Sequence, residues 1–95
     1  MLPQFLQPCF PSYNLKALDV KRDKKLIITE ILNKGDDKAV RWLGEHYRVD
    51  EIKKTVANPT RGMWLSSILN HWLKIFNLKL DKMTYKKAII NLNQF

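Results

Sequence analysis

Two helical segments meet within residues 49–76, VDEIKKTVANPTRGMWLSSILNHWLKIF, and the turn between them decides the fold. A basic segment, VDEIKKTVA, precedes Asn58-Pro59, and an aromatic segment, TRGMWLSSILNHWLKIF, follows it. Proline lacks a backbone N–H and disfavours helical geometry at the residue before it, so the break is sharp. Two helices joined by so tight a turn indicate a helical hairpin or a helix-turn-helix.

The second of these helices is expected to span Thr60 to Phe76 and to lie at the centre of the core. Its apolar residues recur on one side at helical spacing. Outward from this pair, further helices are predicted over about 20–33, 36–47 and 50–57, and a last one is capped by Thr84. The helix over 20–33 should bury Ile27, Ile28, Ile31 and Leu32 and place Arg22, Lys25, Thr29 and Asn33 on its far side.

Residues 1–18 are interrupted by three prolines and are predicted to form an extended apolar arm. An arm this apolar must pack on its own domain or on a partner. The chain is therefore predicted to be all-α: a compact bundle of four to five short helices in a single domain, residues 19–95, with helix-turn-helix-like character, preceded by the arm.

The chain has a formal net charge of +8, and the excess lies toward the C-terminus. Residues 58–95 contain six basic side chains and a single acidic one, Asp81. This distribution suits a polyanionic partner or an acidic protein surface, and it equally suits a solvated lysine-rich surface.

The composition also indicates the cellular compartment. A single cysteine, Cys9, cannot form an internal disulfide, which favours a reducing environment. No apolar run approaches the ~20 residues that cross a bilayer. The opening MLPQFLQPCFP has early prolines and no basic start, unlike a signal peptide. We therefore expect a cytoplasmic protein with no membrane association.

Catalysis requires a nucleophile, a base or a metal held in convergent geometry. The two histidines, His46 and His71, lie on different predicted helices without an acidic neighbour at ligand spacing. Cys9 is distant from both in sequence, and Asp36-Asp37 suits a helix cap better than a metal site. We expect neither an enzyme nor a bound cofactor or metal.

Basic and polar residues cluster around the turn at Asn58-Pro59. In a helix-turn-helix, the outer face of the second helix would meet base edges, while basic residues of the first would contact phosphates. The broad apolar face of the second helix is explained equally well by a core position. The candidate nucleic-acid-binding residues are Arg48, Lys53, Lys54, Thr60, Arg61, Ser67, Asn70 and Lys74.

Residues 9–56 contain a recognisable series of motifs: Phe10 with Ser12-Tyr13-Asn14, Leu18-Asp19, the helix from Lys25 to Asp36, Arg41-Trp42-Leu43, Tyr47 and Glu51-Ile52-Lys53. In these features the chain resembles small prokaryotic domains encoded beside AbiEii-type nucleotidyltransferase toxins. Pro11 and Gly44 depart from that pattern, in which an aromatic and a larger residue are usual. The resemblance covers roughly residues 5–78 and implies an antitoxin that counters a toxin which transfers nucleotides.

The leading hypothesis is thus an antitoxin of a toxin–antitoxin system that binds and neutralises a nucleotidyltransferase toxin. We expect removal of residues 1–18 to abolish neutralisation while leaving the helical core folded. For each anchor, packing within the domain is the other interpretation. The candidate partner-binding residues are Phe5, Leu6, Phe10, Tyr13, Trp42 and Trp64.

A toxin that binds tRNA should itself be basic, so binding of this basic chain to the toxin would require a locally acidic face on the chain. The residues that could form such a face are Asp36, Asp37, Glu45, Asp50 and Glu51. The alternative hypothesis is a helix-turn-helix-like transcriptional regulator that binds its own promoter DNA, and both roles can coexist on one chain. A third interpretation is a structural adaptor without a nucleic-acid role.

Overall fold

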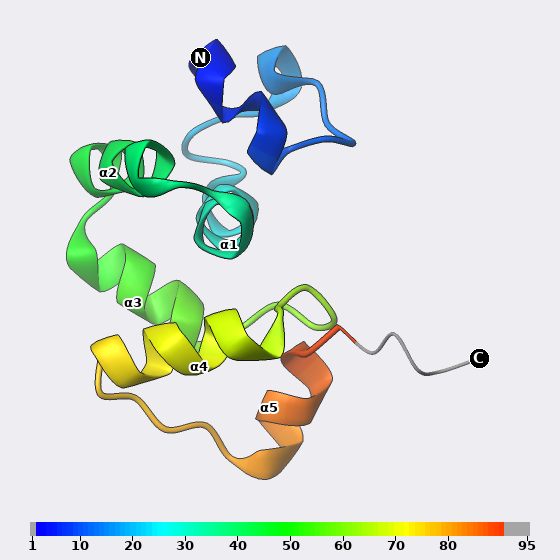
Figure 1. The fold of residues 1–95 in the computed structure, drawn as a ribbon, viewed down its shortest axis with the longest axis vertical. Helices are drawn as coiled ribbons and strands as arrows, with labels where there is room; N and C mark the ends of the chain where they lie inside the picture. The colour runs from blue at the N-terminus through cyan, green and yellow to red at the C-terminus, as the bar shows by residue number, and fades with distance from the viewer. Residues whose placement is uncertain (1, 91–95) are drawn as a thin grey trace.

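The computed structural model describes residues 2–90, and every regular element in that range is a helix, which confirms the predicted all-α class. Two short 3-10 helices open the chain and five α-helices come after them (Figure 1). Their bounds are η1 (Gln4–Cys9), η2 (Leu15–Ala17), α1 (Lys24–Lys34), α2 (Asp37–His46), α3 (Val49–Ala57), α4 (Ser66–Ile75) and α5 (Lys82–Ala88). No helix in the described range is both long and apolar enough to cross a membrane.

Helix α1 lies at the centre of the molecule and contacts η1, α2, α3 and α4. Figure 1 shows α1 almost end-on, with the N-terminal segment on one side of it and α4 and α5 on the other. The predicted stripe of Ile27, Ile28, Ile31 and Leu32 is confirmed as buried. The predicted polar far side is wrong at Thr29 and Asn33, because both are buried as well. A helix buried on almost every side is a core helix.

The central position predicted for α4 is therefore wrong. Only Leu69 of this helix is buried, while Leu65 just before it and Ile75 at its end are exposed. Helix α4 packs against α3 and α1 with one side and leaves the other to solvent.

Helix α4 begins at Ser66 and not at Thr60 because residues 62–64 are held in another conformation. Gly62 has φ +73°, a left-handed geometry that ends helical continuity and favours glycine. Trp64 then pairs with the chain after α5: its backbone N donates to the carbonyl of Ala88 at 2.9 Å, and its carbonyl accepts from Ile90 N at 2.8 Å. Residues 60–65 thus serve to fasten α5 to the core.

This loop also corrects the predicted helix-turn-helix across Asn58-Pro59. Residues 58–65 separate α3 from α4, whereas the turn of a DNA-binding helix-turn-helix has about three to four residues. The break at Asn58 is real, because α3 ends at Ala57 and Asn58 has non-helical backbone angles, φ −125° and ψ 65°. After this break the chain forms a structured loop rather than a tight turn.

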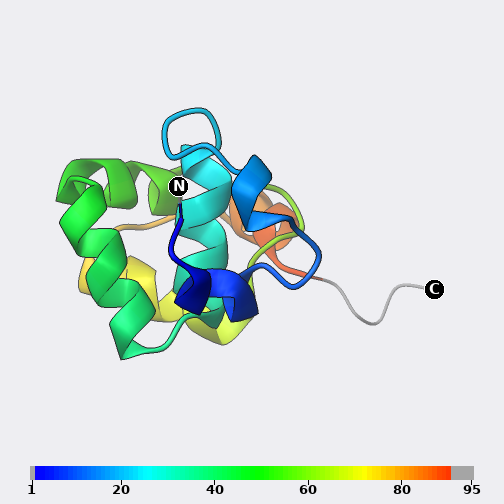
Figure 2. The same ribbon diagram turned by 90° about the horizontal axis from the view of Figure 1, so that it is seen from above.

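The extended arm is also a wrong prediction. Residues 4–9 form η1 and residues 15–17 form η2, and η1 packs on α1 (Figure 2). Leu6 and Phe10 have no exposed surface, and Leu15 is buried. The apolar residues of this segment are therefore part of the domain's own core.

Two helix starts are set by caps. Asp36 Oδ1 accepts from Ala39 N at 3.0 Å and starts α2, as predicted for this residue pair. The last helix begins at Lys82 because Asp81, and not Thr84, is its cap: Asp81 Oδ1 accepts from Thr84 N at 3.1 Å. Each such cap satisfies a backbone donor that has no partner inside the helix.

Candidate partner-binding surfaces

An acidic hollow lies at the corner where α2 passes into α3. It is lined by residues 44–51, encloses about 700 Å³ and is open to solvent. Glu45 and Asp50 are exposed there, and Glu51 is partly exposed. Between them stands Val49, whose surface is 68% exposed, the largest value among the exposed large hydrophobic side chains of residues 2–90. Three carboxylates against one exposed cation, Arg48, leave a net negative charge around Val49, which is suited to a partner that is basic around an apolar contact. We call residues 44–51 the acidic corner.

Hydrogen bonds fix the shape of this corner. The Glu51 carboxylate accepts from Arg48 N at 3.0 Å, which caps α3, and from Lys24 Nζ at 2.9 Å. The backbone hydrogen bond from Arg48, followed by the bond from Lys24, holds the pKa of Glu51 below its ordinary value. Glu51 is thus ionised at neutral pH and ties α3 to the start of α1.

The α2 side of the corner is equally restrained. Tyr47 donates its hydroxyl proton to the carbonyl of Val20 at 2.8 Å, and burial is the main cause that raises the pKa of this phenol to about 12. His46 Nδ1 lies 2.8 Å from the carbonyl of Trp42, and its ring stacks on the indole at 4.2 Å. The corner is therefore preorganised, which lowers the entropic cost of binding.

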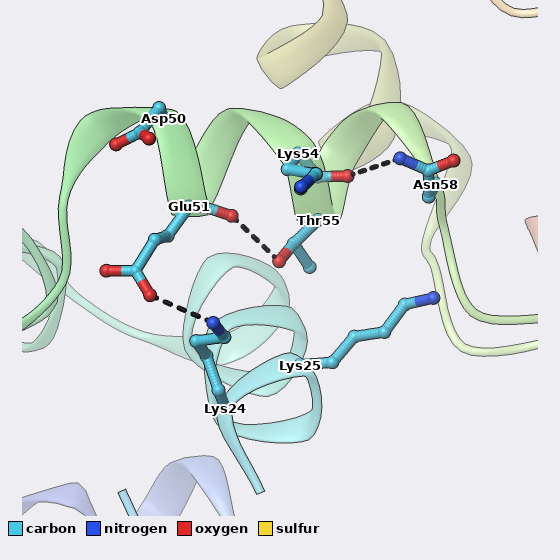
Figure 3. A pocket seen from close by; sticks show the side chains of 7 residues that line it. All are labelled: Lys24, Lys25, Asp50, Glu51, Lys54, Thr55 and Asn58. Atoms are coloured by element: carbon cyan, nitrogen blue, oxygen red, sulfur yellow. Dashed lines mark hydrogen bonds and ion pairs between the residues drawn. The ribbon is translucent and has the colours of Figure 1, made fainter. Parts of the chain in front are cut away.

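A second hollow, of about 500 Å³, runs between α1 and α3 (Figure 3). Lys24 reaches across it to Glu51, and Thr55 Oγ1 donates to the Glu51 carbonyl at 3.0 Å. Lys25 and Lys54 add positive charge, and Asp50 offsets part of it. This groove is close to charge balance, so it does not single out an anionic ligand.

Two observations concern metal-ligating and nucleophilic side chains. Within residues 2–90, no group of three or more His, Cys, Asp or Glu side chains could hold a metal ion. Cys9 is buried, and this burial, followed by the charges of Asp36 and Glu30, raises the pKa of its thiol. A buried thiol with a raised pKa is a poor nucleophile.

The structure places the predicted partner-binding residues in two groups. Leu6, Phe10 and Trp64 have no exposed surface and Trp42 is 8% exposed, so these four cannot be surface anchors in this conformation. Phe5 and Tyr13 do reach the surface, at 38% and 39% exposure. Lys38 Nζ lies 4.3 Å from the centre of the Phe5 ring, and the Tyr13 ring meets that of Phe10 edge-on.

The predicted nucleic-acid-binding residues are distributed over α3, α4 and the segment before each of these helices. Arg48 belongs to the acidic corner, while Lys53 and Lys54 lie on α3. Thr60 and Arg61 lie in the loop before α4, and Thr60 is only partly exposed. Ser67, Asn70 and Lys74 share one exposed face of α4, because they are spaced three and four residues apart.

Two features of these surfaces were not singled out from the sequence. Val49 opens a helix, where an exposed valine gives no periodic signal. Lys86 and Lys87 counted only toward net charge, because nothing in the sequence shows that the end of α5 returns to Arg61. That return is made by the hydrogen bond from Gly62 N to the carbonyl of Lys87, at 2.8 Å.

The fold and its surfaces together define a small helical domain with a preorganised acidic corner. Residues 5–56 match the model of a family of unknown function, DUF6922, and the chain belongs to that family. The match covers η1 through all but the end of α3, so the acidic corner lies within it and α4 and α5 lie beyond it. No similar curated protein or solved structure was found for the chain.

Proposed function

We propose that this protein is an antitoxin that acts by binding, without catalysis, and that its partner is a nucleotidyltransferase toxin. The observation that carries the proposal is the acidic corner: Val49, exposed and framed by Glu45, Asp50 and Glu51, on a chain whose net charge is +8. A toxin that holds tRNA needs a basic surface. The corner is the part of this chain that such a surface would attract.

Two further observations support this proposal. The corner lies inside the residues that match the family, so it belongs to the unit that the family shares. The proposed kind of partner comes from the resemblance of residues 9–56 to domains encoded beside nucleotidyltransferase toxins. Asp36 and Asp37 cap and begin α2 at its far end, and the exposed cations Lys38 and Arg41 separate them from the corner.

Because the acidic corner is small, the proposal requires that a few of its residues supply most of the binding free energy. An exposed apolar residue that becomes fully buried in a partner contributes about 1.5–3 kcal/mol. Charges at the rim of an interface mainly raise the association rate and fix orientation. Val49 is therefore expected to control the dissociation rate, and Asp50 and Glu45 the association rate and its dependence on salt.

The test is co-purification with the product of the adjacent gene, which the proposal predicts to be a nucleotidyltransferase, followed by kinetic binding measurements. Val49→Ser with Asp50→Asn should weaken the complex at least tenfold and abolish rescue of growth. Met83→Ser is the matched control, because Met83 is 61% exposed on α5, outside the corner. Absence of any complex with the unaltered chain, or equal weakening by the control, would refute the proposal.

A further inference from the structure

A second charged surface lies on the other side of the molecule, around α5. It consists of five exposed cations, which we call the α5 basic surface: Arg61, Lys79, Lys82, Lys86 and Lys87. Lys82 and Lys86 share one face of α5, about 6 Å apart along the helix axis. The hydrogen bond from Gly62 N to the Lys87 carbonyl, 2.8 Å long, brings the loop that carries Arg61 against the end of this helix.

One acidic side chain, that of Asp81, offsets part of the positive charge of this surface. All ion pairs found in residues 2–90 join residues between Arg22 and Glu51. The Asp81 Oδ1 accepts from Thr84 N at the start of α5. Hydrogen bonds from Thr84, and to a smaller extent the charge of Lys87, hold the pKa of this carboxyl below its ordinary value, so it stays ionised beside the cations. Five cations against one carboxylate leave an excess of positive charge, which attracts an oppositely charged polymer.

The composition of the surface indicates which polymer. Lysine is depleted from protein–protein interfaces, which rely on aromatic and apolar anchors. On the described part of α5, Met83 is the one large hydrophobic residue that is exposed, and the aromatic Tyr85 is half-buried. A single-stranded nucleic acid would require exposed aromatic rings on which bases can stack. Lysine and arginine without such rings are suited to the phosphates of a duplex.

We propose that the α5 basic surface binds the phosphate backbone of a nucleic-acid duplex through charge, without reading base sequence. This inference goes beyond the antitoxin role: the surface lies outside the family-matched residues and apart from the acidic corner. It also differs from a helix-turn-helix, because no helix has to enter a groove. The phosphate contacts would hold the protein close to a duplex while its acidic corner stays free.

The test is a salt titration of binding to labelled 20-base-pair duplexes of mixed sequence, one of DNA and one of RNA, monitored by fluorescence anisotropy. Each lost phosphate contact should reduce the slope of log K against log salt by about 0.9. Lys82→Gln, Lys86→Gln and Lys87→Gln together should therefore reduce the slope by about 2.7. Comparison of the two duplexes shows which nucleic acid this surface prefers.

The matched control carries Lys16→Gln, Lys21→Gln and Lys25→Gln, three exposed lysines that precede α2 and are not candidate nucleic-acid contacts, and it changes net charge equally. It should keep most of the slope. All of these positions are exposed, so neither variant should change the melting temperature by more than a few degrees. Equal loss in both variants, no binding at low salt, or binding only to anionic lipid vesicles would each overturn the inference. None of these results depends on the toxin.

Discussion

The side chain of Asn33 in α1 fixes the chain that enters α4, because its Oδ1 accepts from the backbone N of Leu65 at 3.1 Å. The Nδ2 of the same residue donates to the Met63 carbonyl at 3.0 Å and to the Thr29 carbonyl at 3.0 Å. A single buried amide thus satisfies the backbone on both sides of Trp64. This arrangement is the reason that a polar residue occupies the predicted solvent side of a core helix.

Asn33→Ala should lower the free energy of unfolding by about 3 kcal/mol, because it leaves buried backbone groups without partners. Urea denaturation measures this loss. Asn70→Ala is the control: Asn70 is exposed on α4, and its replacement should change stability by less than about 0.5 kcal/mol. Similar losses for both variants would show that the Asn33 side chain does not anchor the loop.

The N-terminal segment supplies a matched pair of phenylalanines. Phe10→Ala should cost about 3–5 kcal/mol, because Phe10 has no exposed surface. Phe5→Ala should cost about 1 kcal/mol or less, since Phe5 is 38% exposed and its main polar contact is Lys38. Thermal unfolding monitored by circular dichroism compares the stability losses of the two variants.

The same burial changes the expected result of deleting residues 1–18. Deletion removes Leu6, Phe10 and Leu15 from the core, so the truncated chain should lose cooperative unfolding. The expectation that the remaining helices would stay folded is therefore replaced by its opposite. A truncated chain with the unfolding transition of the full chain would show that the segment packs only loosely.

Gly35 and Gly44 form a second matched pair. A Cβ at Gly35 would lie 2.6 Å from the Ile31 carbonyl oxygen and 2.9 Å from Ala39 Cβ, so α1 and α2 would have to separate. Gly35→Ala should therefore destabilise the fold by about 1–3 kcal/mol. At Gly44, inside α2, a Cβ meets nothing within 4 Å, and Gly44→Ala should stabilise the fold by about 0.5–1 kcal/mol. Denaturant midpoints that move in the same direction would contradict this.

Tyr47 gives a prediction in alkaline solution. Its phenol has a pKa of about 12 in the folded chain against an ordinary value of 10.0, so folding favours the protonated form. The stability from this group is complete below pH 10.0 and is lost as pH rises toward about 12. Tyr47→Phe should cost about 1 kcal/mol at neutral pH, from the lost hydrogen bond to the Val20 carbonyl.

The measurement is the free energy of unfolding between neutral pH and about pH 12 for both chains, because lysines that titrate in this range affect both equally. The difference between the two chains should narrow as pH rises. A constant difference would mean that the Tyr47 phenol ionises as readily in the folded chain as in the unfolded one.

Much of the secondary structure was readable from local patterns. Apolar spacing placed α1, α2 and α3 within a few residues of their observed bounds, and the Asn58-Pro59 break ended α3 as predicted. The errors in the helix predicted over residues 60–76 share one cause. Residues 60–65 have the composition of a helix start. The backbone groups of residues 63–65 instead form hydrogen bonds with Asn33, Ala88 and Ile90, which are distant in the sequence. These hydrogen bonds override the local helix propensity.

The candidate surfaces divide in the same way. Burial of the arm could not be predicted, because an apolar segment packs on whichever surface is free. The acidic corner required the two-residue connection at Tyr47 and Arg48 to bring the end of one helix beside the start of the next. Charge counting predicted a basic C-terminal part, and only the return of α5 to the Arg61 loop gathers those cations on one surface.

By itself the sequence determined that this protein is helical, where its first helices run and how its charge is distributed, since helical spacing, caps and charge are local properties. The tertiary structure alone decided which helix is central, which aromatic residues are buried and which charges become neighbours. Those outcomes depend on contacts between residues some 30 positions apart, such as Asn33 with Met63 and Leu65. No local pattern encodes them, because each partner is satisfied only when the other is already in place.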